Sequence, residues 1–284
     1  MTGKARRRIP FTKMHGIGND YVYIDIFSTA VEDPAALARR VSPRRTGIGS
    51  DGLILIGPSA RADCRMEMYN ADGSRGEMCG NGIRCVAKYV YERGLARVSP
   101  LRVETDAGVK TLWLVVRDGE VESVTVDMGE PVLEGSLIPV AAEGEIVDHP
   151  LTVDGGEYRV TCVSMGNPHC VVFTDGIASL AVEAIGPLFE RHPFFPRGVN
   201  AEFVEVAGRR RLFARVWERG SGETAACGTG ACAAVVAGVR TGRSERRVTV
   251  TLCGGDLEIE WREADNRVYM TGGAQHVFEG VLEL

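Results

Sequence analysis

Two cysteines of this chain lie in the same short pattern. Cys79 begins the sequence Cys-Gly-Asn-Gly and Cys227 begins Cys-Gly-Thr-Gly, and helix-forming residues follow in both places. We therefore expect each cysteine to lie just before a helix N-terminus, with Asn81 and Thr229 as the N-cap residues. The free amides and the dipole of a helix N-terminus favour negative charge, which lowers the pKa of a neighbouring thiol. The same amides can hold the carboxylate of a substrate.

A thiolate and a thiol on opposite sides of a carbon atom could invert its configuration. One removes a proton from the carbon and the other returns a proton to the opposite face, so no cofactor is needed. A redox pair is the other use of two such cysteines, and the sequence leaves this alternative open. Five further cysteines are expected to be small packing residues: Cys64, Cys162 and Cys253 in strand-like segments, and Cys85 and Cys232 within the helices.

The segments that must position the two cysteines are repeated along the chain. Cys79 and Cys227 are 148 residues apart (227 − 79 = 148), and so are Asn19 and Asn167, each of which follows a glycine. The same offset relates Tyr69-Asn70 to Trp217-Glu218, and Gly94 to Gly242. One offset shared by several landmarks predicts a duplicated architecture, which would supply two equivalent acid/base groups to one pocket.

Strand-like segments outnumber helical ones. We expect strands over residues 21–26, 53–56, 112–116 and 248–252. We expect helices over residues 33–40, 81–93, 187–191 and 229–240. In the first helix, Asp33 is the expected N-cap and Pro34 the first helical residue.

The composition narrows the class of protein. Of 284 residues, 44% are hydrophobic and 25% are charged, and the formal net charge is −5. These values exclude a disordered chain. A membrane-spanning helix is also excluded, because no uninterrupted apolar run reaches about 18 residues. The acidic balance argues against duplex nucleic acid as a partner.

The N-terminal residues and the cysteines indicate the cellular compartment, and the cysteines and lysines limit the cofactors that the protein could use. The basic residues 4–8 are followed by no apolar segment, so we expect a solvated tail, not a secretory signal. Without such a signal, eight cysteines indicate a reducing cytoplasm, and the lack of a Cys-x-x-Cys pair argues against a zinc site. A pyridoxal phosphate enzyme would have to use one of only four lysines: Lys4, Lys13, Lys88 and Lys110.

Seven motifs make the chain recognisable. They lie in one order at residues 11–20, 69–74, 78–85, 164–169, 198–203, 217–220 and 226–230. With these motifs, the chain resembles the diaminopimelate epimerase family over nearly its full length. The resemblance implies an isomerase that interconverts LL- and meso-2,6-diaminopimelate, a small-molecule substrate, without pyridoxal phosphate or metal. The product feeds lysine and peptidoglycan synthesis.

The resemblance also implies a fold. It is a mixed α/β fold with two pseudo-symmetric domains, each a mixed, curved β-sheet around a central helix, and with the site in the cleft between them. The central helices would be those that begin near Asn81 and Thr229. We expect one domain at residues 1–126 plus 273–284, carrying Cys79, and the other at residues 127–272, carrying Cys227.

Residue roles carry over from the family motifs. Cys79 and Cys227 would be the acid/base pair. His169 would partner Cys79 and Glu218 would partner Cys227, because an imidazolium favours a thiolate whereas a carboxylate favours a thiol. The expected substrate-binding residues are Asn19, Asn70, Asn167, Asn200, Glu218 and Arg219, with Arg219 on the distal carboxylate, and the backbone amides of Gly80, Asn81, Gly228 and Thr229 on the reacting carboxylate.

One position departs from the family pattern. Many relatives carry glutamine where this chain has Gly52, which the 148-residue offset pairs with Asn200. Because Gly52 has no side chain, any contact there would come from its backbone or through water.

The C-terminal segment suggests a homodimer. Tyr269, Phe278, Val281 and Leu282 could all fill the core of the first domain. Strand alternation should instead send some apolar residues outward, and an aromatic at the position of Phe278 lies at the dimer contact in relatives.

Three rival interpretations are weaker. Racemases of the proline racemase type share paired cysteines but have different flanking motifs, and Asn70 and Trp217-Glu218-Arg219 argue against them. A related isomerase fold lacks the cysteine pair. A non-catalytic thiol protein would bind metal stoichiometrically or would work as a disulfide.

Overall fold

The structure is a computed structural model that describes residues 8–283. The chain divides into two compact units, one formed by Met1–Val126 and Gly273–Leu284 and the other by Asp127–Gly272. The expected basic tail lies outside the described residues, apart from Arg8, which begins the first strand. Among the described residues, no helix combines the length and apolar character that crossing a membrane requires.

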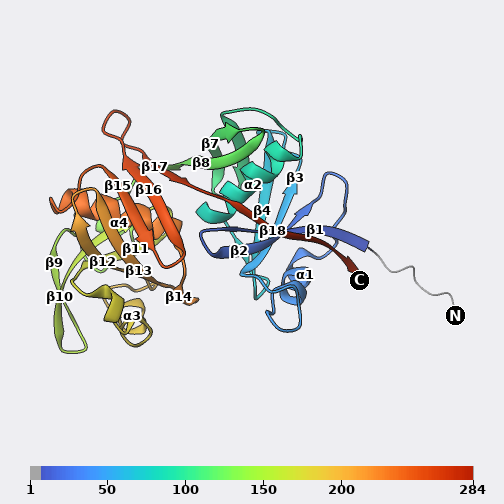
Figure 1. The fold of residues 1–284 in the computed structure, drawn as a ribbon. Coiled ribbons are helices and arrows are strands. Elements are labelled where there is room, and N and C mark those ends of the chain that lie inside the picture. Colours follow the sequence, from blue (N-terminus) through green and yellow to red (C-terminus); the bar gives the residue numbers. More distant parts are fainter. Residues whose placement is uncertain (1–7, 284) are drawn as a thin grey trace. The chain divides into compact units, whose positions relative to one another are not determined.

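The first unit is a mixed sheet with two helices (Figure 1). Its strands are β1 (Arg8–Gly16), β2 (Asn19–Asp25), β3 (Gly52–Gly57), β4 (Cys64–Asn70), β5 (Arg75–Gly76), β6 (Leu101–Thr105), β7 (Gly108–Arg117), β8 (Glu120–Gly129), whose last residues belong to the other unit, and β18 (Gln275–Glu283). Its helices are α1 (Pro34–Val41) and α2 (Gly80–Glu92). In sheet order, β18, β1 and β2 are antiparallel, β2 and β3 parallel, β3 and β4 antiparallel, β4 and β6 parallel, and β6, β7 and β8 antiparallel.

The second unit repeats this order. Its strands are β9 (His149–Val153), β10 (Gly156–Ser164), β11 (Pro168–Phe173), β12 (Asn200–Gly208), β13 (Arg211–Glu218), β14 (Gly222–Thr224), β15 (Arg247–Leu252), β16 (Gly255–Trp261) and β17 (Val268–Gly272). Its helices are η1 (Gly135–Leu137), η2 (Ile177–Ser179), α3 (Val182–Glu190) and α4 (Gly228–Arg240). From β10 to β17 the pairings alternate as they do from β1 to β8, with short β14 in the place of β5. The predicted duplication is therefore confirmed in the strand order.

In each unit a helix packs on either face of the sheet, and the strands between the two helices are buried on both sides. In the first unit, α1 packs with Leu53 and Leu55 on one face, whereas Ile54 lies against Gly82 of α2 on the other. All six residues of β3 are buried, which explains its continuous apolar sequence. Residues 80–90 of α2 and nearly all of α4 are buried, so both are central helices.

The same alternation sorts β12 of the second unit. Ala201 and Phe203 pack in the core that includes Phe189 of α3. Asn200 and Glu202 are also buried, but they alternate with Ala201 and Phe203 along the strand, so their side chains lie on the opposite face of the sheet. On that face Glu202 lies against Gly230 of α4. Strand alternation thus delivers polar side chains to the α4 face of the sheet.

Most local predictions hold. Asp33 caps α1 by accepting a hydrogen bond from the amide of Ala36, and Pro34 is its first residue. The four predicted strands lie in β2, β3, β7 and β15, although the helix expected at 187–191 begins earlier, at Val182. Cys253 is a correction: it is exposed, because it lies in the two-residue turn between β15 and β16. The other four cysteines that were expected to pack are buried.

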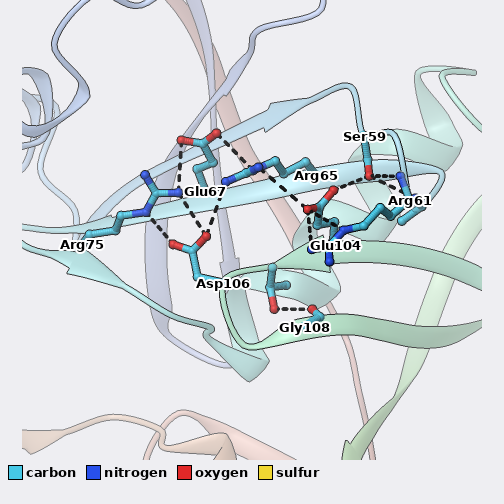
Figure 2. A network of polar contacts seen from close by, with 10 residues as sticks. Ser59, Arg61, Arg65, Glu67, Arg75, Glu104, Asp106 and Gly108 are labelled. Atoms are coloured by element: carbon cyan, nitrogen blue, oxygen red, sulfur yellow. Dashed lines mark hydrogen bonds and ion pairs between the residues drawn. The ribbon is translucent and has the colours of Figure 1, made fainter.

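A network of ion pairs fixes the β4–β5 hairpin of the first unit (Figure 2). Arg75 of β5 contacts Asp106 with two nitrogens, at 2.5 and 3.0 Å, and holds the pKa of that carboxyl below its usual value. Arg65 of β4 extends the network to Glu67 and Glu104. Such exposed pairs each contribute little to stability. Their consequence here is positional, since the hairpin carries Asn70 and leads into the Cys79 turn.

Candidate functional site

Both central helices begin directly after a cysteine, and the cysteine itself is the N-cap. Cys79 has an extended backbone (φ −127°, ψ 118°), and its Sγ accepts a hydrogen bond from the amide of Gly82 at 3.3 Å. Cys227 has a similar backbone (φ −115°, ψ 110°). The prediction of Asn81 and Thr229 as N-caps is therefore wrong: both lie in the first turn, because each helix begins at the glycine after the cysteine.

Asn19 contacts the Cys79 thiol. Cys79 Sγ donates to Asn19 Oδ1 at 3.2 Å, and Asn19 Nδ2 donates to Asp51 Oδ2 at 2.8 Å. Since Asp51 engages the amide nitrogen, the amide oxygen faces the sulfur and stabilises the thiol form. The Gly82 amide has the opposite effect, because a donor to sulfur favours the thiolate. Tyr21 lies close by: burial, and next the charge of Cys79, raise the pKa of its hydroxyl well above the usual value.

Asp51 is itself anchored by charged neighbours. Arg44 Nη2 bridges Asp20 Oδ1 at 2.7 Å and Asp51 Oδ1 at 2.8 Å. Lys13 Nζ, almost fully buried, lies 2.5 Å from Asp20 Oδ2. Burial acts to raise the pKa of Asp20, but hydrogen bonds from Arg44 and Lys13 bring it below the usual value. Asp20 therefore stays ionised, and the cluster fixes the strand end that carries Asn19.

Two further candidates of the first unit, Asn70 and Gly52, lie on neighbouring strands. Asn70 pairs with Gly52 across β3 and β4, and its Nδ2 donates to Ser74 Oγ at 3.0 Å. A Cβ atom at Gly52 would lie 2.1 Å from the carbonyl oxygen of Tyr69, so this backbone leaves no room for a side chain. The departure from the family's glutamine is thus built into the strand pairing.

Arg84 fixes the first turn of α2 from inside the unit. It is completely buried, and its guanidinium donates to the carbonyl of Gly80 at 3.0 Å and to Asn81 Oδ1 at 2.9 Å. The side chain of Asn81 is thereby held by the protein.

Cys227 of the second unit is more enclosed than Cys79. It is 5% exposed, and its Sγ lies 3.4 Å from Thr229 Oγ1. Burial raises the pKa of its thiol well above the usual value, and the carboxylates of Glu218 and Glu202 raise it further, against hydrogen bonds from Thr229 and the Gly230 amide that act to lower it. Burial and the two carboxylates therefore favour the thiol form of Cys227.

A hydrogen-bonded chain leads away from Thr229. Asn167 Nδ2 donates to Thr229 Oγ1 at 3.3 Å, and Asn167 Oδ1 lies 3.0 Å from His169 Nε2. His169 Nδ1 lies 2.6 Å from Glu202 Oε1, and both of these side chains are completely buried. The expected pairing of His169 with Cys79 joins two units and stays a prediction.

Asn200, Glu218 and Arg219 meet at the end of β13. Asn200 Nδ2 donates to the carbonyl of Pro168 at 2.9 Å, and its Oδ1 accepts the amide of Arg219 at 2.9 Å. Glu218 accepts a hydrogen bond from the Thr224 hydroxyl at 2.5 Å. Asn200 thus uses its amide group to hold the turn that presents the other two.

The sequence analysis missed three residues that lie near the two cysteines or contact the predicted site residues: Tyr21, Asp51 and Glu202. The 148-residue offset contained a signal for two of them, since it pairs Tyr21 with His169 and Ile54 with Glu202. Among residues 8–283, no group of three or more His, Cys, Asp and Glu side chains is arranged to hold a metal ion.

A model of the family described as diaminopimelate epimerase matches residues 11–134 and 161–277. The chain belongs to the diaminopimelate epimerase family. It is 58% identical over 275 residues to the diaminopimelate epimerase of Acetivibrio thermocellus, covering 96% of this chain and 98% of that one. It is 56% identical over 272 residues to that of Moorella thermoacetica, covering 95% of this chain and 98% of that one. The family predicted from the motifs is thereby confirmed.

Solved structures share the fold of this family member. One is a hydroxyproline epimerase from Agrobacterium vitis, with a TM-score of 0.72 and 18% identity, covering 98% of this chain and 93% of that one. Another is a phenazine biosynthesis protein of the PhzF family from Bacillus anthracis, with a TM-score of 0.71 and 15% identity, covering 98% of this chain and all of that one. At this identity the likeness concerns the fold alone, and the predicted mixed α/β class is confirmed.

The two N-cap cysteines of this diaminopimelate epimerase family member should differ in reactivity. We expect Glu218→Gln to speed alkylation of Cys227 by iodoacetamide at neutral pH, because removing a carboxylate lowers the pKa of the thiol. The thiolate fraction should rise about tenfold for each unit by which that pKa falls, and the rate should rise by less, because a less basic thiolate is a weaker nucleophile. Peptide mass spectrometry separates Cys227 from the exposed Cys253, whose rate is the internal control. Equal Cys227 rates in both proteins would contradict the assignment of Glu218 as its partner.

Proposed function

We propose that this chain interconverts LL- and meso-2,6-diaminopimelate by a two-base transfer of the α-proton between Cys79 and Cys227. The observation that carries the proposal is the duplicated N-cap cysteine at the start of each central helix. Relatives at 51–58% identity are named diaminopimelate epimerase, which supplies the substrate. The reaction would serve lysine and peptidoglycan precursor synthesis in the cytoplasm.

The proposed proton balance is simple. One cysteine, as thiolate, takes the α-proton and becomes a thiol, while the other thiol gives its proton to the opposite face and becomes a thiolate. Because burial and two carboxylates keep Cys227 protonated, we assign it the role of acid in the resting enzyme and Cys79 that of base. His169 is the proposed partner of Cys79, and Glu218 that of Cys227.

The helix N-termini would stabilise the charge that develops on the substrate. As the α-proton leaves, negative charge spreads onto the carboxylate of the reacting carbon. Backbone amides in the first turns of α2 and α4 point at such a group and cost little reorganisation. The proposed donors are the amides of Gly80, Asn81, Gly228 and Thr229.

The rest of the substrate needs polar partners. We assign its ammonium and carboxylate groups to Asn19, Asn70, Asn167, Asn200, Glu218 and Arg219, with a backbone contact from Gly52. The two compact units are the proposed domains, at residues 1–126 plus 273–284 and at residues 127–272.

The test is isotopic. Purified reduced protein is incubated with LL-diaminopimelate in D2O, and NMR and chiral chromatography follow α-deuterium and the meso form. Deuterium should appear in the product, and added chelator should leave the rate unchanged, because no step uses a metal. Exchange with proline but not diaminopimelate, or chelator-sensitive activity restored by metal, would refute the proposal.

We also propose a homodimer through β18. Phe278 and Val281 are 46% and 48% exposed, although Phe278 packs edge-on against Phe11 at 5.9 Å. β18 pairs antiparallel with β1. The interpretation that Tyr269, Phe278, Val281 and Leu282 all fill the first domain's core is wrong, because Tyr269 belongs to the other unit and two of the four are exposed.

Phe278→Glu should convert the dimer into a monomer. A carboxylate placed in an apolar contact loses its hydration, and in a two-fold interface the penalty occurs twice. Light scattering at micromolar concentration gives the mass, and Phe27→Glu, at another exposed aromatic, is the matched control. A monomeric unaltered protein, or a Phe278→Glu dimer, would count against this interface.

A further inference from the structure

The second unit buries His169, the proposed partner of Cys79, against the side chain of Glu202, which makes no proposed contact with the substrate. His169 Nδ1 and Glu202 Oε1 lie 2.6 Å apart, and the exposed fraction of both side chains is 0%. Among the described residues, the other carboxylate oxygen, Oε2, has no hydrogen-bond partner. A buried oxygen without a partner costs about 1–3 kcal/mol, so this glutamate is not explained by stability.

In the first unit, the positions equivalent to His169 and Glu202 hold no ionisable pair of this kind. The 148-residue offset places Tyr21 opposite His169 and Ile54 opposite Glu202. The strand registers agree, because Tyr21 pairs with Gly52 in β2 and β3, just as His169 pairs with Asn200 in β11 and β12. The fold therefore accepts an apolar residue at this position, as Ile54 shows, and the buried carboxylate of Glu202 is found only at the equivalent position of the second unit.

The helix start is adapted to Glu202. A Cβ atom at Gly230 would lie 2.8 Å from Glu202 Oε1 and 3.3 Å from Cys227 Cβ. Glycine in the first turn of α4 thus lets the carboxylate approach the N-terminus, where helix amides favour negative charge. In the first unit, the equivalent Gly82 faces Ile54.

The contacts determine where the protons lie. Asn167 gives its amide hydrogens to Thr229, so its oxygen faces His169 Nε2 and that nitrogen must carry a hydrogen. One further proton lies between His169 Nδ1 and Glu202 Oε1. It makes either an imidazolium with a carboxylate or an imidazole with a carboxylic acid, and the pair is neutral in both cases.

We propose that Glu202 is a positioning residue: by sharing one proton with His169, it fixes the Nε2–H toward Asn167 and, through Asn167 and Thr229, the hydrogen bond that Cys227 receives. The last link follows from Thr229, whose oxygen accepts from Asn167 and whose hydrogen is free to point at the sulfur, 3.4 Å away. The role of this chain of contacts in epimerisation rests on the proposed function.

The decisive variant is Glu202→Gln, which keeps size and hydrogen bonding but cannot share the proton. In the unaltered protein we expect nitrogen-15 NMR to show His169 protonated at Nε2, with a far-downfield proton on Nδ1 from the short hydrogen bond. In Glu202→Gln this signal should disappear. We expect kcat to fall by about a hundredfold, the lower end of what loss of a positioned acid or base costs. Glu205→Gln, on the same strand, removes one carboxylate and should change neither readout.

The outcomes separate the possible roles. A variant that loses stability but keeps the Nδ1 signal and kcat would make Glu202 merely structural and overturn the proposal. If Glu202→Gln does not fold, the unaltered protein still decides, because a missing Nδ1 proton signal overturns proton sharing. If the unaltered protein exchanges no α-hydrogen of diaminopimelate, the proposed function fails, whereas the His169 spectrum reports on the pair independently.

Discussion

Each of the two single variants, Cys79→Ala and Cys227→Ala, should abolish epimerisation. The proposed reaction needs a proton acceptor on one face of the α-carbon and a donor on the other, and neither variant has both. A positioned acid or base contributes about 10²- to 10⁴-fold to a rate, so we expect kcat to fall by about a hundredfold to ten-thousandfold. The measurement is formation of meso-diaminopimelate from the LL form by chiral chromatography.

The two variants should differ in what they still do. Each keeps one cysteine, which can take the α-proton from one epimer and return solvent deuterium to the same face. Slow exchange without inversion is therefore expected for one epimer with Cys79→Ala and for the other epimer with Cys227→Ala. This opposite preference would place the cysteines on opposite faces of the carbon, which loss of activity alone does not do.

The matched control is Cys253→Ala. Cys253 is exposed in the β15–β16 turn, so its replacement should leave kcat and stability unchanged. Near-normal turnover by Cys79→Ala or Cys227→Ala would refute the two-base proposal, and exchange of the same epimer by both variants would contradict the opposed arrangement.

The duplication could be predicted from the sequence because short motifs at equivalent positions of the two units are still similar. A single offset relates the two asparagines and the two cysteine turns, and the strand orders of the two units agree with it. Glycine after each cysteine marked the helix starts to within one residue. The N-cap assignment failed because Asn81 and Thr229 are strong capping types, whereas sulfur is a weak acceptor that sequence preferences rank low.

Asp51 and Glu202 were missed for a different reason. Each acts through a side-chain hydrogen bond to a residue that is distant in sequence: Asp51 to Asn19, and Glu202 to His169. Sequence patterns report which face of a strand is buried, but not which polar atom across the sheet a buried carboxylate meets. Cys253 was placed in a strand because residues 248–252 before it alternate apolar residues with threonine, although the tight turn at Cys253 and Gly254 ends the strand.

Arg219→Ala should remove most of the enzyme's preference for a substrate with a distal carboxylate. Arg219 is held at both ends. Its backbone amide donates to Asn200 Oδ1, and its guanidinium Nη1 donates to the carbonyl of Arg197 at 2.9 Å. A Cβ atom added at Gly198, whose φ is +70°, would lie 3.0 Å from Arg219 Cδ, so this loop runs close beside the aliphatic part of the Arg219 side chain. Within the described residues, the guanidinium makes this one hydrogen bond, and its other N–H groups can meet a carboxylate.

We expect kcat/KM for LL-diaminopimelate to fall by about a hundredfold in Arg219→Ala, the loss of roughly 1.5–3 kcal/mol for hydrogen bonds to a charged group. L-Lysine, which lacks only the distal carboxylate, should be a poor substrate for the unaltered enzyme and equally poor for the variant. Arg197→Ala is the control, because it removes a neighbouring exposed arginine and keeps the carbonyl that holds Arg219. If Arg219→Ala impaired lysine and diaminopimelate to the same extent, Arg219 would act on the reacting end of the substrate and not on the distal carboxylate.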